Sequence, residues 1–563
     1  MHHHLSLRRK LIIMVSVMAS LFLVALDQTI IATALNKIVE EFNSFSSLSW
    51  VVTAYLITTT ITVPIAGKLS DIFGRRTILL IGVAIFVFGS LMSGISGNIT
   101  ELIIWRAIQG IGGGIITANA FTIVGDLFAA RERGRWQGLI GAVFGLSSVV
   151  GPLLGGWLAD GATFFGVTTD WRWTFFINVP IGIVAFILIA IYSPQLKHAS
   201  KAVVDYVGAA FLSIALATLI LAVDNTESIF SGVLDATGMS LAGLRVGMFS
   251  IVALSIAGFI YAEYKAKDPI LPLRFFKNRN YVIIITIAAL FGAAFMGSIL
   301  YLTQFNQQVF GASPTESGLM LLPMVAGIML TSIVSGQIIS KTGRYKIFMQ
   351  VGFIVATIMM ALMATLTPES SYTYEATIMV LLGMGMGVAM PVLTLAVQSE
   401  FEQKDLGVAT SSNQLFRSLG STVGTAVFGA MLTAGVLTQV PAMKETAYIQ
   451  SLQQNAQVAR IGDLNDPNTL LTLNMPDVKE GITSGAAEAI AGLPQAAQEQ
   501  VKSQFTENQD EFTTIVTHAF SESLRTIFIV AASLTGAATV LVFMLKERRL
   551  RAASSAVTPG QAE

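Results

Sequence analysis

The first apolar segment of the chain reads LIIMVSVMASLFLVALDQT from Leu11 to Thr29 and continues to Leu35. A helix rises about 1.5 Å per residue, so roughly 20 apolar residues are enough to cross a bilayer. Asp27 interrupts the segment about 24 Å from its Leu11 end. A charge at such a depth costs roughly 2.5–3.5 kcal/mol on insertion scales. We therefore expect Asp27 to have a partner or a function, and our hypothesis is that it takes up and releases a proton.

The composition indicates that the whole chain, and not only this segment, belongs in a membrane. Of the 563 residues, 53% are hydrophobic and 12% charged, with a mean hydropathy of +0.68. Soluble domains average about 25% charged residues. Lys plus Arg and Asp plus Glu balance at 34 each, so the net charge gives no support to a nucleic-acid partner.

The chain offers few residues for metal or thiol chemistry. It has no cysteine, and its histidines are His198, His518 and a tag-like run at positions 2–4. We therefore expect no metal site, no cofactor and no catalytic thiol.

Hydropathy divides the chain into about fourteen apolar segments. They are residues 11–35, 50–68, 77–96, 102–124, 137–158, 173–192, 206–223, 244–261, 281–303, 318–339, 347–366, 377–397, 412–436 and 523–545. Lys and Arg gather in alternate connections between these segments, and acidic residues gather in the others, apart from the acidic connection Glu400–Asp405. An excess of Lys and Arg marks the cytoplasmic side, so we expect a multi-pass protein of the cell membrane with both termini inside.

The segments predict the following organisation. The parts are an N-terminal tail or tag (1–10), an N-terminal six-helix bundle (11–204), two inserted linker helices (205–264), a C-terminal six-helix bundle (265–545) and a cytoplasmic tail (546–563). The second bundle contains a long acid-rich connection, residues 437–522, which we place outside the cell. We interpret it as a solvated insert in which stretches such as residues 486–505 can form short helices; the alternative is a cap that contacts a substrate or partner.

Three motifs recur in the same order in the two bundles. GKLSDIFGRR at 67–76 corresponds to GQIISKTGRYK at 336–346, RAIQGIGGG at 106–114 to MVLLGMGMG at 379–387, and GLSSVVGP at 145–152 to SLGSTVGT at 418–425. Parallel repeats of this kind are typical of transporters, which bind substrate near the midplane between the halves.

Together these motifs resemble the major facilitator superfamily, specifically its fourteen-helix drug:proton antiporter branch. The resemblance covers essentially the whole chain and includes LDQTI at 26–30, WRWTFFINVP at 171–180 and PLRFFKNR at 272–279. It implies an all-α polytopic fold of two six-helix bundles plus two inserted central helices. It also implies proton-driven export of lipophilic, often cationic, compounds.

Asp27 and Arg106 are the candidates for proton coupling and for recognition of substrate charge. They lie roughly 12 Å and 6 Å below the same membrane face, within reach of a long Arg side chain. A pair that separates and rejoins would let protonation and cation binding compete for one carboxylate. The alternative is a static buried ion pair that fixes helix packing.

Two further groups are candidates for conformational roles. The cytoplasmic gate comprises Gly67, Asp71, Gly74, Arg75, Arg76 and Asp126, in which we expect Arg75 to contact Asp126. The hinge or seal in the fifth span comprises Gly145, Gly151, Pro152, Gly155 and Gly156. For the gate residues, the alternative is that their positive charge only sets the membrane topology. For the hinge residues, the alternative is ordinary helix packing.

The candidate substrate cavity combines polar side chains with Met residues, which adapt to varied lipophilic ligands. Its members are Gln28, Thr33, Tyr55, Asn119, Tyr301, Gln304, Met324, Met384, Asn413 and Gln414. Arg417 is expected to reach the membrane surface or to pair with Glu400 or Asp405. The glycine run 110–114 lacks the Gly-Lys-Ser/Thr of a nucleotide loop, so the energy source is expected to be an ion gradient.

The sequence thus predicts a monomeric proton-coupled antiporter that exports lipophilic drugs or toxic compounds by alternating access. We expect these compounds to be cationic. Its other partners would be protons and membrane lipid. An exporter of a lipid or glycolipid from the inner leaflet is the alternative. An enzyme would need clustered His, Glu or Asp within the spans, where none appears, and a channel would need neither the carboxylate nor the repeat.

Overall fold

The computed structural model describes residues 5–42, 48–159, 161–164, 166–195, 203–223, 226–312, 314–453, 464, 467–474, 476–492 and 494–550. Within these ranges, 14 helices are long and apolar enough to cross a membrane. The predicted polytopic all-α fold is therefore confirmed. The described strands form one antiparallel hairpin, β1 (Thr163–Phe164) with β2 (Val167–Thr168). The tag residues 1–4 and the tail from 551 onward lie outside the described residues.

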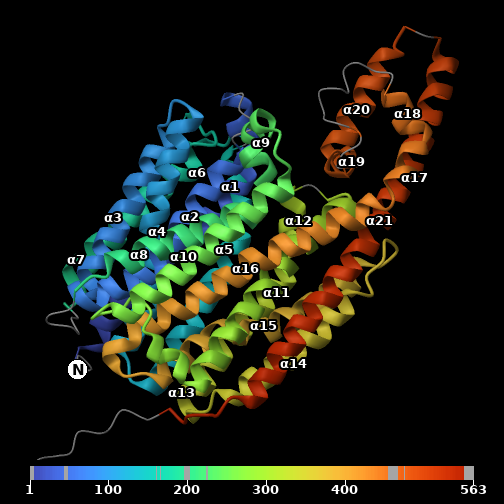
Figure 1. Cartoon of the computed structure of the whole chain (residues 1–563). Helices are drawn as coiled ribbons and strands as arrows, with labels where there is room; N and C mark the ends of the chain where they lie inside the picture. Colours follow the sequence, from blue (N-terminus) through green and yellow to red (C-terminus); the bar gives the residue numbers. More distant parts are fainter. Residues whose placement is uncertain are drawn as a thin grey trace, which may run out of the picture.

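The helices form two bundles joined by a linker (Figure 1). The first bundle, here the N half, consists of α1 (Leu7–Phe42), α2 (Leu48–Phe73), α3 (Arg75–Gly94), α4 (Ile99–Leu127), α5 (Ala130–Ala159), α6 (Trp173–Phe176) and α7 (Asn178–Tyr192). The linker consists of α8 (Tyr206–Val223), α9 (Thr226–Thr237) and α10 (Leu241–Lys265). The C half consists of η2 (Leu273–Lys277), α11 (Arg279–Val309), α12 (Pro314–Met320), α13 (Leu322–Thr342), α14 (Lys346–Met363), α15 (Tyr372–Glu400), η3 (Gln403–Asp405), α16 (Leu406–Leu437) and α21 (Gln495–Met544).

The repeat in the sequence appears as a repeat of helix pairings. In the N half α2 packs on α4, α3 on α4, and α1 on both α5 and α7. In the C half the corresponding pairs are α13 on α15, α14 on α15, and α11 on both α16 and α21. The glycines of the repeated loop motif also correspond: Gly74 and Gly343 both follow a helix with positive φ, 97° and 70°. Glycine reaches this region without steric cost, which explains its place in both copies.

The two halves meet mainly along two symmetry-related contacts, α5 with α13 and α2 with α16. In the first contact the backbones approach so closely that a Cβ atom on Gly138 would lie 2.2 Å from the carbonyl oxygen of Ser332. A Cβ on Gly336 would lie 2.4 Å from the carbonyl oxygen of Gly134. Small residues at four-residue spacing permit this approach between membrane helices. We call this contact the glycine seam.

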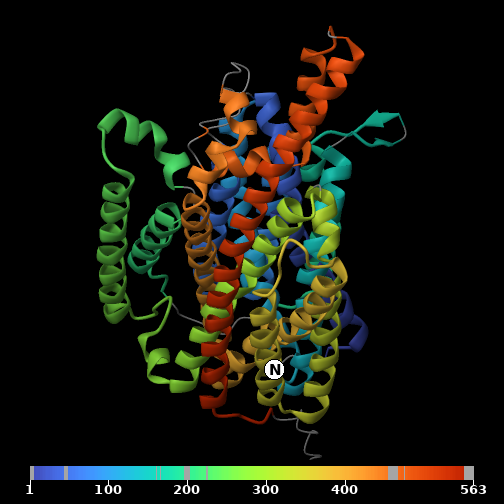
Figure 2. The ribbon, with the colours of Figure 1, turned by 90° about the vertical axis from the view of Figure 1, so that its right-hand side faces the viewer.

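The linker helices lie on one side of the bundles (Figure 2). α8 packs on α10 and also contacts α2 and α16, so the linker covers the second contact between the halves. Glu263 of α10 is buried, and its two carboxylate oxygens accept hydrogen bonds from the backbone N–H groups of Ile270 and Leu271 at 3.0 and 3.1 Å. These bonds secure the chain where it enters the C half.

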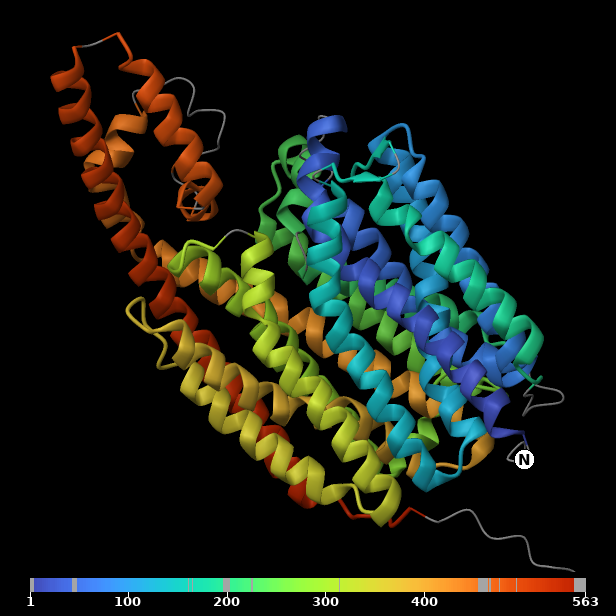
Figure 3. The same ribbon diagram turned by 180° about the vertical axis from the view of Figure 1, so that it is seen from behind.

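The long connection between α16 and α21 is more helical than expected. It contains α17 (Val440–Glu445), α18 (Ala447–Gln453), α19 (Pro467–Leu473) and α20 (Pro476–Ala489). Figure 3 shows these helices projecting beyond the bundles at the end opposite the chain termini. Helix was expected in stretches such as 486–505, and helix is present there on both sides of a short break: α20 ends at Ala489 and α21 begins at Gln495. The last span is the end of α21, a helix of 50 residues, about 75 Å long.

The end of the bundles at which the described part of the chain begins and ends is called the terminus side. The opposite end, which carries α17 to α20, is called the loop side.

The glycine seam makes a direct prediction about stability. Gly138→Ala places a methyl group against a backbone oxygen, so we expect the midpoint of thermal unfolding in detergent to fall by several degrees, since overpacking costs about 1–3 kcal/mol. Gly247→Ala in α10 is the matched control, because nothing lies within 4 Å of the added methyl group. Equal midpoints for the two variants would show that the seam is not as tight as described.

Candidate functional site

Asp27 and Arg106 meet in the interior of the N half. The Arg106 guanidinium donates to Asp27 Oδ2 at 2.5 Å, across from α4 to α1. Asp27 is 0% exposed and Arg106 1% exposed. The ion pair expected from the depths of the two residues is therefore present. Because neither side chain contacts solvent, the pair is retained only while both charges remain.

Two amides complete the coordination of the Asp27 carboxylate. Gln109 Nε2 donates to Oδ1 at 2.9 Å, and Asn178 Nδ2 donates to the same oxygen at 3.3 Å. Asn178 also donates to Ser90 Oγ at 3.0 Å, which ties α7 to α3. Donors from α4 and α7 thus converge on a carboxylate of α1. We call these four residues, Asp27, Arg106, Gln109 and Asn178, the buried network.

Aromatic rings hold Arg106 in place on its other sides. Its guanidinium carbon lies 4.3 Å from the centre of the Tyr55 ring and 5.6 Å from that of Phe175. Its Nε donates to the Val51 carbonyl at 3.3 Å. When the carboxylate loses its charge, Arg106 keeps the favourable contact with Tyr55 but loses its counter-ion. The arrangement therefore permits Arg106 to change partners without leaving its site.

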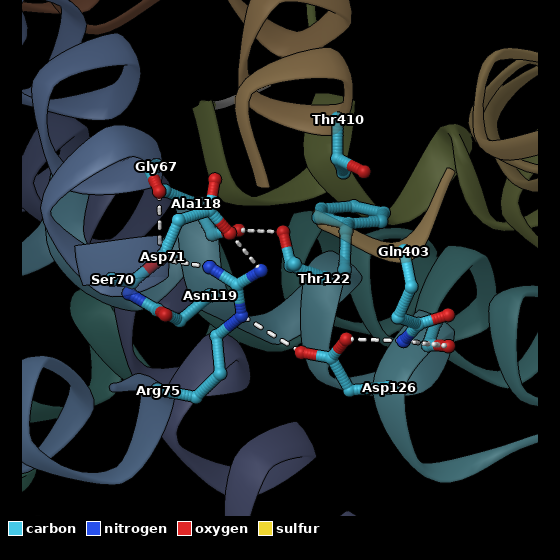
Figure 4. A network of polar contacts seen from close by, with 12 residues as sticks. Gly67, Ser70, Asp71, Arg75, Ala118, Asn119, Thr122, Asp126, Gln403 and Thr410 are labelled. Atoms are coloured by element: carbon cyan, nitrogen blue, oxygen red, sulfur yellow. Dashed lines mark hydrogen bonds and ion pairs between the residues drawn. The ribbon is translucent and has the colours of Figure 1, made fainter. Parts of the chain in front are cut away.

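A second network of polar contacts joins α2, α3 and α4 at the terminus side (Figure 4). Arg75 Nε donates to Asp126 Oδ2 at 2.8 Å, and the same guanidinium contacts Asp71 and Ser70. Arg75 is 0% exposed. The contact of Arg75 with Asp126 is the one that the sequence predicted.

This second network extends into the C half. Gln403 Nε2 of η3 donates to Asp126 Oδ1 at 2.5 Å and to the Gly125 carbonyl at 3.1 Å. Gln398 Nε2 of α15 donates to the Phe121 carbonyl of α4 at 3.1 Å. A Cβ on Gly67 would lie 2.2 Å from Ser411 Oγ of α16. The terminus side is thus closed by contacts between the halves.

The remaining gate candidates have other positions. Arg76 contacts the carbonyl of Ala190 near the end of α7, so it does not join the network around Arg75. Gly74 forms the turn between α2 and α3. Asn119, predicted to line the cavity, instead lies beside the gate in Figure 4; it is 0% exposed and donates to the Ile115 carbonyl at 2.9 Å.

The hinge candidates divide between the two faces of α5. Gly145 faces α13 of the C half, where a Cβ would lie 3.3 Å from Met329. Gly151 faces α1 of its own half, where a Cβ would lie 1.9 Å from Thr29 Oγ1. Pro152 lies within α5 near Gly318 of α12, whereas Gly155 and Gly156 are buried near the loop-side end of the helix. The close contact between the halves is therefore made mainly by Gly134 and Gly138, which precede the hinge candidates in α5.

The cavity candidates come together only in part. Asn413 and Gln414 are adjacent on α16, 2% and 1% exposed, and each has an amide oxygen without a hydrogen-bond partner. Tyr301 donates to the Thr425 carbonyl at 3.2 Å between α11 and α16. Gln28 is exposed on α1 and Gln304 half-buried on α11. Tyr55 packs against Arg106 of the buried network.

Two cavity candidates, Met384 and Met324, lie elsewhere than predicted, and the side chain of a third, Thr33, is not described. Met384 lines a groove between α13, α14 and α15 that also includes the exposed Val334 and Val351, so it faces away from the other half. Met324 is 1% exposed in the core of the C half, where its backbone packs against Gly383. The side chain of Thr33 is not among those described. Residue type alone does not distinguish a Met in a core or on an outer surface from one in a cavity.

Arg417 has neither of the partners that were expected. Glu400 forms an ion pair with Arg548 at 3.3 Å, and Asp405 forms one with Arg274 at 2.8 Å. The Arg417 guanidinium instead lies 5.7 Å from the centre of the Phe144 ring in α5. It therefore points across the boundary between the halves and not to the membrane surface.

Sequence reasoning missed several residues of the site. Gln109 and Gln403 carry no charge and were not considered, although Gln109 stands three residues after Arg106 and so shares its helix face. Glu375 is a further buried acid, 0% exposed; in the amide orientation that satisfies both groups, Asn306 donates to its two oxygens at 2.7 and 3.0 Å. Its place in the first turn of α15 made it look like a loop residue.

Outside the membrane spans, one ion pair fastens the loop side of the N half. Arg172 donates to Glu41 Oε1 at 2.7 Å, and Trp171 Nε1 donates to Glu41 Oε2 at 2.6 Å. The hydrogen bond from Arg172 lowers the pKa of Glu41 below its usual value. The pair lies within one half, so it does not close the loop side against the C half.

Two repeated helix bundles that meet along matched helix pairs, with buried charges inside the first, define the class of two-bundle membrane transporters. The chain belongs to the Major Facilitator Superfamily, whose family model matches residues 17–425.

Several relatives are named as multidrug transport or resistance proteins or as efflux pumps. The chain is 36% identical over 493 residues to the multidrug transporter protein MdtP of Bacillus subtilis, covering 86% of this chain and 87% of that one. It is 32% identical over 538 residues to multidrug resistance protein 3 of the same organism, covering 95% of each chain. It is 31% identical over 498 residues to the efflux pump dotC of Dothistroma septosporum, covering 86% and 80%.

Solved structures show the same fold. The human organic anion transporter MFSD10 superposes with a TM-score of 0.56 at 16% identity, covering 75% of this chain and 93% of that one. The proton:xylose symporter XylE superposes with a TM-score of 0.55 at 16% identity, covering 75% and 88%.

The cross-half contacts of Asp126 lead to a prediction about opening of the terminus side. The chain has no cysteine, so Ser411→Cys supplies a single thiol that is buried while that side is closed. Adding Asp126→Asn removes the charge that Arg75 and Gln403 share, so we expect a membrane-impermeant maleimide to label residue 411 several-fold faster.

The control for the labelling experiment is Glu402→Gln in the same Ser411→Cys background. Glu402 is exposed and pairs only with Lys404 among the described residues, so its loss should leave the rate unchanged. Equal labelling rates in all three proteins would contradict the gate.

Proposed function

We propose that this transporter is a proton-coupled antiporter that exports lipophilic drugs or toxic compounds across the cell membrane by alternating access. The observation that carries the proposal is the buried network, in which a carboxylate without solvent contact depends on one arginine and two amides. Such a group changes its charge only together with a rearrangement around it. The names of the relatives support drug export.

The coupling step follows from the balance of charge inside the N half. A proton that enters from the loop side binds an Asp27 oxygen and neutralises the carboxylate. Arg106 is then a buried cation without a counter-ion, which is unfavourable by several kcal/mol unless it moves toward water or another partner. Relative movement of α1 and α4 relieves this cost. Release of the proton toward the terminus side restores the pair and resets the cycle.

The closed terminus side supplies the second half of the proposal. The contacts of Arg75, Asp126 and Gln403 hold the halves together there. Lys and Arg near the chain ends place that side in the cytoplasm by the positive-inside rule, with both termini inside. In this account the described conformation is closed to the cytoplasm, and breaking these contacts admits cargo from inside.

The expectation of cationic cargo rests on competition with the proton for Asp27. In the described conformation three donors occupy the Asp27 oxygens, so a cation reaches this carboxylate only after Arg106 has left it. Cationic cargo therefore stays a prediction from the sequence.

A second candidate function, export of a lipid or glycolipid, is favoured by an apolar groove on the loop side. The groove encloses about 620 Å³. Its apolar lining comes from α18, α20 and α21 and includes Leu452, Val478, Ile482, Ile490 and Phe505. The helices that line it project beyond the bundles on the loop side (Figure 3), where a lipid released at the outer face would leave in this proposal.

A flux measurement separates these functions. The purified protein in proteoliposomes is supplied with an outward-directed proton gradient or none, and with a lipophilic dye, either cationic or anionic, or with a lipid. Wild type should move protons when dye is added, and Asp27→Asn should abolish uphill transport, because the neutral amide cannot exchange a proton.

The matched control is Glu227→Gln, an exposed acid of α9. Dye-independent flux that requires lipid would favour the second function. Uphill pumping by Asp27→Asn at the normal rate would overturn the coupling mechanism.

A further inference from the structure

Arg417 is a charge in the membrane region that the proposed coupling mechanism does not use. It lies on α16 of the C half, and its guanidinium reaches Phe144 on α5 of the N half, 5.7 Å from the ring centre. The side chain is partly exposed. Among the described residues, Arg417 forms no ion pair with a carboxylate; the acids nearest along the chain, Glu400 and Asp405, are held by Arg548 and Arg274.

A guanidinium in this setting is costly to keep without an anion. Arg at the depth of a membrane span is unfavourable by roughly 2.5–3.5 kcal/mol on insertion scales. Arginines in such positions normally pair with a carboxylate or with backbone carbonyls. The guanidinium of Arg417 instead contacts an aromatic ring, which offsets only about 0.5–2 kcal/mol.

The neighbours of Arg417 on α16 complete a polar face. Asn413 and Gln414 precede it by four and three residues, so they lie on the same side of the helix. Both are buried, and each has an amide oxygen without a hydrogen-bond partner. The oxygen and nitrogen of a side-chain amide exchange places by a simple rotation, so each amide can present N–H donors to an anion.

The other side of this region is aromatic. Phe144 of α5 stacks on Phe121 of α4, with ring centres 6.1 Å apart and planes 24° apart. Phe144 is partly exposed and offers an apolar surface to the body of a ligand whose head group lies at Arg417, and the buried Phe121 supports it from behind. Residues from both halves would therefore contact one molecule, as a transporter's substrate site requires.

We propose that Arg417 is the subsite for an anionic head group, so that the cargo of this transporter is a lipophilic anion carrying a carboxylate or phosphate. Arg417 binds the head group through paired N–H donors, Asn413 and Gln414 add further donors, and Phe144 contacts the apolar body. The inference rests on the proposed export function, whose substrate class it specifies. It is an alternative to the cationic cargo predicted from the sequence, and the probes described next distinguish the two.

Binding to the purified full chain tests the proposal without a proton gradient. The probes share a dansyl-undecyl body and end in a carboxylate, a methyl ester or a trimethylammonium group. At a pH where the acid is ionised, wild type should bind the acid about tenfold or more tightly than the ester, since charge-assisted bidentate pairs are strong. Equal affinity for acid and ester, or tightest binding of the trimethylammonium probe, would overturn the proposal.

Variants assign the preference to Arg417. Arg417→Gln should lower the affinity for the acid about tenfold, to that of the ester, and leave the ester unchanged. Arg417→Lys keeps the charge and should retain part of the preference, which guards against a folding defect, as does the thermal midpoint of each variant. Arg245→Gln, an exposed arginine of α10, is the matched control. Unaltered affinity of Arg417→Gln for the acid would overturn the assignment.

Two further arms complete the test. A dansyl-undecyl phosphate distinguishes the source of the head group: tighter binding than the acid supports a lipid phosphate, and weaker binding supports a carboxylate. Asp27→Asn should keep the preference for the acid while losing proton-driven transport. If Asp27→Asn pumps normally while the Arg417 preference holds, the coupling mechanism fails and the anion subsite stands.

Discussion

Asp27 and Arg106 stabilise each other in an interior that would exclude either charge alone. Both side chains are essentially without solvent contact, and Gln109 and Asn178 take up the remaining capacity of the carboxylate. These donors come from α4 and α7, so the position of three helices depends on the ionisation of one group. A change of charge at Asp27 would therefore change the packing of the N half, which is the physical basis of the coupling that we propose.

The two halves share a fold but differ in chemistry. Arg106 corresponds to Met379 in the repeat, and Asp71 of the gate corresponds to Ser340. The N half thus contains both ion networks, whereas Arg417 of the C half points across the boundary toward Phe144. The division suggests that the N half responds to protons and that the C half contributes charge recognition of cargo. The contacts between Asp126 and Gln403 then transmit one half's state to the other.

The sequence was informative where a residue type is costly in its setting. The spans follow from hydropathy, and the pairing of Asp27 with Arg106 and of Arg75 with Asp126 follows from the cost of buried charge. It was less informative where many positions are equivalent. Met384 looks like any cavity methionine, and the seam glycines Gly134 and Gly138 look like ordinary small residues, because which face of a helix meets the other half is decided by tertiary packing.

Infrared difference spectroscopy on the reconstituted protein tests the central claim most directly, because it observes the protonation of a carboxyl group itself. A step in pH across the working range should produce the carbonyl stretch of a protonated carboxylic acid. We expect this band in wild type, with an isotope shift in heavy water, and we expect its loss in Asp27→Asn. A band of full intensity in Asp27→Asn, or no band in wild type, would contradict a proton-exchanging Asp27.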